Sequence, residues 1–97
     1  MSDIVAEFIA HLGPRVTGTL QGTAKLVITD EGSIMLSDQG AVEGDTEADV
    51  TLKASEQVFR NILDGSQNPA MAFMSGKLKV DGSNMRALKV SEILTAD

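Results

Sequence analysis

The fifteen residues from Asn68 to Gly82 constrain the fold more than any other part of the chain. They read Asn-Pro-Ala-Met-Ala-Phe-Met-Ser-Gly-Lys-Leu-Lys-Val-Asp-Gly. Proline fits the first position of a helix because its missing N–H would be unsatisfied there, and Asn68 can cap that end. Gly76 suits the left-handed conformation that often follows a helix. The segment therefore predicts a helix over residues 69–75, followed by a strand.

This short helix carries more apolar side chains than one contact face requires. Ala70, Met71, Phe73 and Met74 occupy most of its circumference. Such a helix is either covered by protein on both sides or faces an apolar group that is not protein. The second alternative is where a function would arise.

Alternating apolar and polar residues predict the strands of a sheet. The period of two recurs in residues 24–29, 34–36, 50–52 and 78–80, with a shorter strand at 41–43. Such alternation indicates one buried and one wet face, which is typical of antiparallel pairing. Lys77 and Lys79 point outward in this scheme, where they protect a sheet edge or aid solubility.

Apolar stripes at helical spacing predict three further helices. The first covers residues 4–12 and is ended by Gly13-Pro14, whereas residues 15–21 fit neither helix nor strand. Ser55 caps a second helix, and a last helix with two apolar arcs starts near Asn84. Because the helices mostly follow the strands, we expect an α+β fold with a five-stranded antiparallel or mixed sheet, one face of which is covered by helices. The whole chain, residues 1–97, is expected to form one domain.

Composition and charge exclude several classes of function. The absence of cysteine removes disulfides, thiolate metal sites and cysteine nucleophiles. A net charge of −6, with no Trp or Tyr, argues against nucleic-acid binding. The same charge argues against stable residence on anionic membranes and leaves at most transient contact. Because Met1-Ser2-Asp3 is not a basic leader and no apolar run is long enough to span a membrane, we expect a cytoplasmic protein.

No residue pattern predicts catalysis, a metal site or a cofactor. His11 is the only histidine, and the local sequence places no orienting carboxylate or nucleophile beside it, so a surface position is expected. Acidic residues between positions 45 and 56 match a calcium loop in spacing. However, Val50 stands where that loop needs glycine, and it begins a stretch that alternates as a strand.

Residues 65–94 resemble the C-terminal half of the sterol carrier protein 2 family. That family has Asn-Pro before an apolar helix ending Phe-Met-Ser-Gly-Lys-Leu, then a strand closing in glycine and a final Ala-Leu-Lys helix. The same pattern stands here at residues 68–69, 73–78, 82 and 87–89, and residues 48–54 match the family's strand before its central helix. The resemblance implies a single-domain, non-catalytic lipid-binding fold with an apolar tunnel between the sheet and the C-terminal helices.

Nine apolar side chains are candidates for lining that tunnel. From the residues alone, ordinary core packing is the favoured explanation, although methionine suits surfaces that must fit variable apolar shapes. The family resemblance favours the tunnel. The candidate lipid-binding residues are Phe59, Ile62, Leu63, Met71, Phe73, Met74, Leu78, Met85 and Leu88.

The expected function is that of a lipid carrier without a cofactor. Its ligand would be a long apolar chain, such as a fatty acid, an acyl-coenzyme A, a sterol or an isoprenoid. Burial of a dozen methylenes at about 0.8 kcal/mol each gives roughly 10 kcal/mol before ordering and association costs, which is compatible with micromolar affinity. The alternative is an accessory module with a filled core, which binds a protein partner in a lipid- or quinone-modifying assembly.

Overall fold

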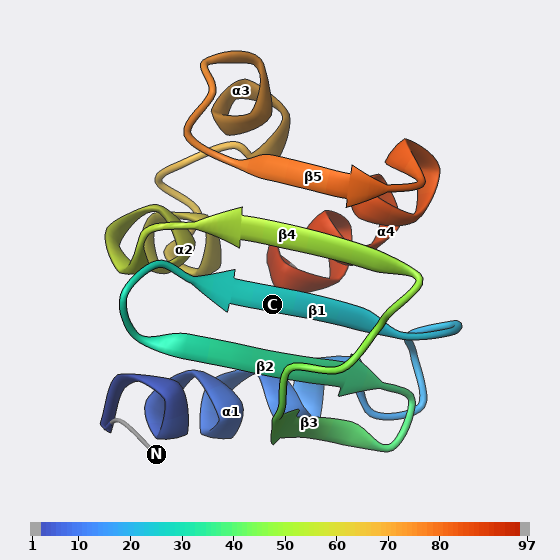
Figure 1. The fold of residues 1–97 in the computed structure, drawn as a ribbon. Coiled ribbons are helices and arrows are strands. Elements are labelled where there is room, and N and C mark those ends of the chain that lie inside the picture. The colour runs from blue at the N-terminus through green and yellow to red at the C-terminus, as the bar shows by residue number, and fades with distance from the viewer. Residues whose placement is uncertain (1–2, 96–97) are drawn as a thin grey trace.

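The computed structural model describes residues 3–95, which form four helices and one five-stranded sheet (Figure 1). In chain order the elements are α1 Asp3–Val16, β1 Ala24–Ile28, β2 Gly32–Ser37, β3 Gly40–Glu43, β4 Val50–Ala54, α2 Glu56–Asp64, α3 Pro69–Met74, β5 Lys79–Gly82 and α4 Asn84–Thr95. The expected α+β class is confirmed. The two ends of the expected domain, residues 1–2 and 96–97, lie outside the described residues.

The sheet is mixed, with the strand order β3-β2-β1-β4-β5. Strands β1 and β4 pair in parallel, with Ala24 opposite Val50 and Ile28 opposite Ala54, and the other three pairs are antiparallel. The expected five-stranded sheet, antiparallel or mixed, is therefore confirmed as a mixed one. The antiparallel pairing of which the alternation is typical does not hold for β1 and β4. The reason is that alternation reports burial on one face and carries no information about strand direction.

Three helices, α1, α2 and α4, cover one face of the sheet, whereas α3 lies beyond the β5 edge (Figure 1). The strand residues that point toward these helices are buried, and those on the other face are partly or fully exposed. The apolar core consists of Val5, Phe8, Leu12, Val16, Leu20, Ala24, Leu26, Ile28, Ile34, Leu36, Val50, Leu52, Ala54, Phe59, Ile62, Ala72, Leu78, Ala87, Val90 and Leu94.

Helix α1 is longer than the sequence predicts. Gly13-Pro14 should end it at Leu12, but the helix continues to Val16. A proline inside a helix removes one backbone hydrogen bond and crowds the preceding turn. Here the added turn buries Val16 completely, and the N–H and hydroxyl of Thr17 both donate to the Gly13 carbonyl, at 3.1 and 2.7 Å. Burial and these two bonds together offset the cost of the proline.

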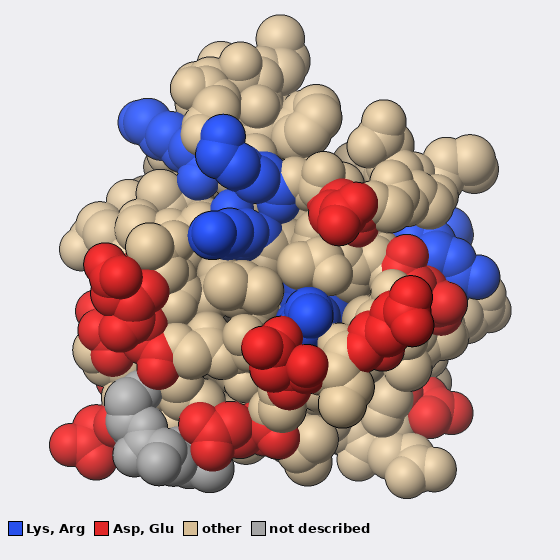
Figure 2. All heavy atoms as spheres, viewed as in Figure 1, with Lys and Arg blue, Asp and Glu red and all other residues tan. Residues whose placement is uncertain are grey.

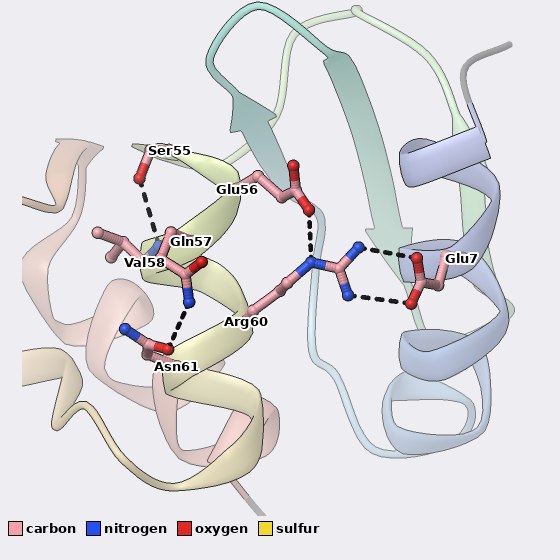
Figure 3. Close-up of polar contacts among 7 residues, drawn as sticks. All are labelled: Glu7, Ser55, Glu56, Gln57, Val58, Arg60 and Asn61. Carbon is pink, nitrogen blue, oxygen red and sulfur yellow. Dashed lines mark hydrogen bonds and ion pairs between the residues drawn. The ribbon is translucent and has the colours of Figure 1, made fainter.

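Helix α2 is fastened to α1 by Arg60 (Figure 3). The Arg60 guanidinium donates to both carboxylate oxygens of Glu7 on α1, at 2.8 and 2.9 Å, and to Glu56 at 2.5 Å. It also lies 5.2 Å from the centroid of the Phe8 ring, a cation–π distance. These hydrogen bonds favour the charged forms of Arg60 and Glu7. They raise the pKa of Arg60, through the acceptors Glu7 and Glu56, and lower the pKa of Glu7.

Helix α3 is short and is positioned by its two ends. As predicted, Pro69 is its first residue, and the side-chain oxygen of Asn68 accepts from the backbone N–H groups two and three residues further on, at 2.8 and 3.3 Å. Gly76 takes the left-handed conformation, with φ of +80°. The two N–H groups after it donate to the Ala72 carbonyl, at 2.9 and 3.1 Å. These bonds fix the direction in which the chain leaves α3 and enters β5.

Candidate functional site

The large hydrophobic side chains that remain exposed gather on α3 and at the start of α4. Among residues 3–95, the exposed ones apart from Val42 are Met71 (60% exposed), Phe73 (48%), Met74 (79%), Met85 (77%) and Leu88 (55%). On α3, only Ala72 is buried. Coverage of α3 by protein on both sides, the first of the two alternatives, is therefore contradicted.

An apolar groove of about 260 Å³ lies between α3, β5 and α4. Its lining residues are Pro69, Ala70, Phe73 and Met74 from α3, Leu78 and Val80 from β5 and the turn before it, and Asn84, Ala87, Leu88 and Ser91 from α4. None of them is charged. The Ser91 hydroxyl donates to the Ala87 carbonyl at 2.8 Å, so much of its polarity is used inside the helix. The groove therefore offers an apolar surface with few competing polar groups.

The nine sequence candidates divide among the groove, the core, two other hollows and the exposed surface. The groove brings together four of them, Phe73, Met74, Leu78 and Leu88. Phe59 and Ile62 are each 1% exposed and belong to the core, where the Phe59 ring meets the Phe8 ring edge-on with centroids 6.5 Å apart. Leu63 and Met85 line two other hollows, and Met71 is exposed outside the groove.

Of the α4 wall of the groove, sequence reasoning found Leu88 and missed Asn84, Ala87 and Ser91. Asn84, Ala87, Leu88 and Ser91 follow the spacing i, i+3, i+4, i+7, which places them on one helix face. Since two of the four are polar and one is small, a search for large apolar residues does not find this face. The helical spacing alone is the signal that predicts it.

A larger hollow of about 510 Å³ lies on another side of α4 and has a more polar lining. It is lined by residues of the 19–23 loop and by charged side chains of α4, among them Arg86. Arg86 donates to the Gln21 carbonyl at 3.2 Å and lies 3.8 Å from a carboxylate oxygen of Asp49. Asp49 also accepts from the backbone N–H of Thr23 at 3.0 Å. These contacts tie α4 to the loop before β1.

The acidic stretch before β4 contributes to the same framework. Asp45 pairs with Lys25 at 3.0 Å, and Val50 begins β4, as the alternation predicts. Among residues 3–95, no group of three or more histidine and acidic side chains is placed to hold a metal ion.

His11 is exposed, as predicted, and lines a hollow of about 310 Å³ between α1 and α2. Glu7, four residues before His11 on α1, and Asp64 of α2 line the same hollow. The spacing of four residues places Glu7 beside His11 on one helix face, which the sequence prediction missed, whereas the fold brings Asp64 there. Glu7 is held by Arg60, and Asp64 accepts from the hydroxyl and the N–H of Ser66, at 2.6 and 2.8 Å. These hydrogen bonds lower the pKa of both carboxyls. Both acids are thus engaged in structural contacts.

Comparison with known proteins identifies the family. Residues 11–95 match the profile of the SCP-2 sterol transfer family. The chain belongs to this family. It is 38% identical over 82 residues to hydroxysteroid dehydrogenase-like protein 2 of Xenopus laevis, a match that covers 76% of this chain and 20% of that protein. The chain therefore spans about a fifth of the length of that relative.

Two further comparisons concern fatty acids. The fatty acid-binding protein of Yarrowia lipolytica is 40% identical over 48 residues, which cover 50% of this chain and 37% of that protein. The solution structure of sterol carrier protein 2 from Aedes aegypti in complex with palmitate has the same fold, with a TM-score of 0.76 at 22% identity over 97% of this chain and 96% of that one. In the part of the chain that is described, no helix is both long and apolar enough to cross a membrane.

Proposed function

We propose that this SCP-2 family chain binds one long apolar chain of fatty-acyl type in the groove between α3, β5 and α4, and releases it reversibly. The observation that carries the proposal is the uncharged groove, whose walls include Phe73, Met74 and Leu88, three large hydrophobic side chains left exposed by the fold. Exposed apolar surface of this kind is unfavourable in water and marks a binding site.

The comparisons support an apolar chain as the ligand. One relative is named as a fatty acid-binding protein, and one structural neighbour is a complex with palmitate. The match to the dehydrogenase-like protein covers a fifth of its length, so its name supports no dehydrogenase activity here. We propose a non-catalytic role, in which binding and release need neither a cofactor nor a covalent step.

The size and lining of the groove favour a thin, flexible ligand. Small-molecule sites usually enclose about 300–1,000 Å³, and the groove, at about 260 Å³, lies just below that range. An extended acyl segment suits such a groove better than a rigid four-ring sterol. Each methylene that it buries contributes about 0.8 kcal/mol, so the length of the buried segment sets the affinity.

Titration with a fluorescent fatty acid, followed by displacement with unlabelled lipids, tests the proposal. We expect saturable binding that strengthens with chain length and that palmitate reverses. Mass spectrometry of organic extracts from the natively purified protein should show the same class of ligand. Flat titrations across several chain classes, or a stable protein partner with no extractable lipid, would contradict the proposal and favour the accessory module.

A further inference from the structure

Methionine is the main oxidisable side chain that the molecule exposes. The sequence contains no cysteine, tryptophan or tyrosine. Methionine is usually buried in folded proteins, but three of the four methionines among residues 3–95 are exposed, namely Met71, Met74 and Met85. The fourth, Met35 on β2, is half-buried. A peroxide in solution can therefore reach three thioether sulfurs of the described chain.

The three exposed thioethers lie in different surroundings. Met74 lines the apolar groove, whereas Met85 lines the more polar hollow on another side of α4. Met71 is on the same helix as Met74 but does not line the groove. Met74 and Met85 are 79% and 77% exposed, so a peroxide should reach both equally well. A change of polarity at Met74 alone would alter the groove.

Helix α3 has no charged residue. On the face in view, Figure 2 shows uncharged side chains at the outer end of the projection that α3 forms in Figure 1, with basic side chains below it. Strands β4 and β5 carry Lys53 and Lys79, which are directly opposite each other in the antiparallel register. Charge on this side of the molecule is therefore carried by the sheet. Because hydrogen peroxide is itself uncharged, exposure decides which sulfur it oxidises.

Oxidation by hydrogen peroxide turns a methionine thioether into a sulfoxide. A lone pair of the sulfur attacks one peroxide oxygen, so that an S–O bond forms while the O–O bond breaks. The hydrogen on the transferred oxygen passes to the other oxygen, which leaves as water. Sulfur is oxidised and the peroxide is reduced. The side chain keeps its length and its methyl group but becomes polar.

We propose that Met74 is an oxidation site, at which conversion to the sulfoxide weakens the binding of an acyl chain in the groove. None of the residues that line the groove is charged. An acyl chain that covers the sulfoxide removes its oxygen from water, which is unfavourable for a polar group, and the affinity should fall about tenfold. Since sulfoxide reductases restore methionine, the change is reversible. This inference rests on the proposed function, because it concerns the same groove.

A bound acyl chain should in turn protect Met74 from oxidation. The chain covers the sulfur in the groove and keeps the peroxide away from it, whereas Met71 and Met85 stay exposed in both states. Coupling between two events at one site is reciprocal, so a modification that weakens chain binding is itself disfavoured by a bound chain. An empty groove therefore loses its affinity to peroxide faster than a filled one.

Titration of a fluorescent fatty acid before and after treatment with hydrogen peroxide tests the proposal. Leucine is apolar, has nearly the same helix propensity as methionine and has no sulfur to oxidise. Treatment should weaken binding about tenfold in the original protein and in Met71→Leu, whereas Met74→Leu should keep its own untreated affinity. Sulfoxide reductases for both epimers should restore binding. Normal binding by the treated original protein, or an equal loss in Met74→Leu, would overturn the proposal.

Oxidation rates at single methionines give a second readout. Mass spectrometry of fragmented peptides resolves them, and palmitate should slow oxidation at Met74 but not at Met71 or Met85. The melting temperature should change little on oxidation, because all three side chains are exposed. Equal slowing at all three methionines, or none at Met74, would overturn the proposal. An untreated protein that does not bind the fluorescent fatty acid would overturn the proposed function, whereas equal binding before and after oxidation of Met74 would overturn the oxidation site alone.

Discussion

Replacement of Met74 by glutamine tests whether the groove holds the acyl chain, and Met71→Gln is its matched control. Both methionines are exposed on the same helix, but only Met74 lines the groove. Glutamine is also unbranched and has nearly the same helix propensity. Exposed substitutions usually change stability by less than about 0.5 kcal/mol. Both variants should therefore unfold at nearly the same temperature as the original protein.

The two variants should differ in chain binding. Full burial of a methionine side chain contributes about 1.5–3 kcal/mol, and a chain in the groove covers roughly half of it. Desolvation of the amide adds a cost of about 0.5–2 kcal/mol. Met74→Gln should thus lose about 1.5–3 kcal/mol, or roughly 10- to 100-fold in affinity, when a fluorescent fatty acid is titrated in solution. Met71→Gln should bind normally. Equal effects of the two substitutions, or no effect of Met74→Gln, would refute the placement of the chain.

Three other predictions concern stability. Phe59→Ala should cost about 3–5 kcal/mol in urea unfolding, because the ring is buried against Phe8, and a loss under 1 kcal/mol would place Phe59 outside the core. Gly82→Ala should lower the free energy of unfolding, since φ is +108° and the new Cβ would lie 2.7 Å from the Asp49 carbonyl oxygen. Gly13→Ala should raise it, because the new Cβ lies inside α1 and meets nothing within 4 Å. A more stable Gly82→Ala variant and a less stable Gly13→Ala variant would contradict the backbone assignment. The hydrogen bonds that Glu7 accepts from Arg60 hold its pKa below the ordinary 4.5. Its contribution to the free energy of unfolding is therefore present above pH 4.5 and is lost as the pH falls through the folded-state pKa. Below pH 4.5, the melting temperature of the Glu7→Gln variant should therefore fall less steeply than that of the original protein. Parallel plots of melting temperature against pH for the two proteins would show that the Glu7–Arg60 pair does not contribute to stability.

Local features of the sequence predict the elements around the groove well. Asn68, Pro69 and Gly76 act through the backbone next to them, so the position of α3 follows from chemistry within a few residues. Gly13-Pro14 predicts a helix end for the same local reason. There the prediction is wrong, because the burial of Val16 depends on packing that a local pattern does not contain.

The composition of the groove could be predicted only in part. The sequence marks Met71, Met74 and Met85 as surplus apolar residues, and all three are exposed. Which of them meets the groove depends on the rotation of α3 and α4 against the sheet, and only Met74 does. The pairing of Lys53 with Lys79 likewise depends on the register between two strands 25 residues apart along the chain. Such long-range placement has no local signal.

The methionine methyl groups offer the most direct measurement of where the chain lies. With ¹³C-labelled methionine methyls and bound palmitate, nuclear Overhauser effects between protein and ligand report which methyls touch the chain. Met74 lines the apolar groove, Met85 lines the more polar hollow, and Met35 lies on strand β2. The proposed function predicts contacts from the Met74 methyl and none from the Met35 or Met85 methyls. Contacts from Met85 in the absence of contacts from Met74 would place the chain in the other hollow and contradict the account.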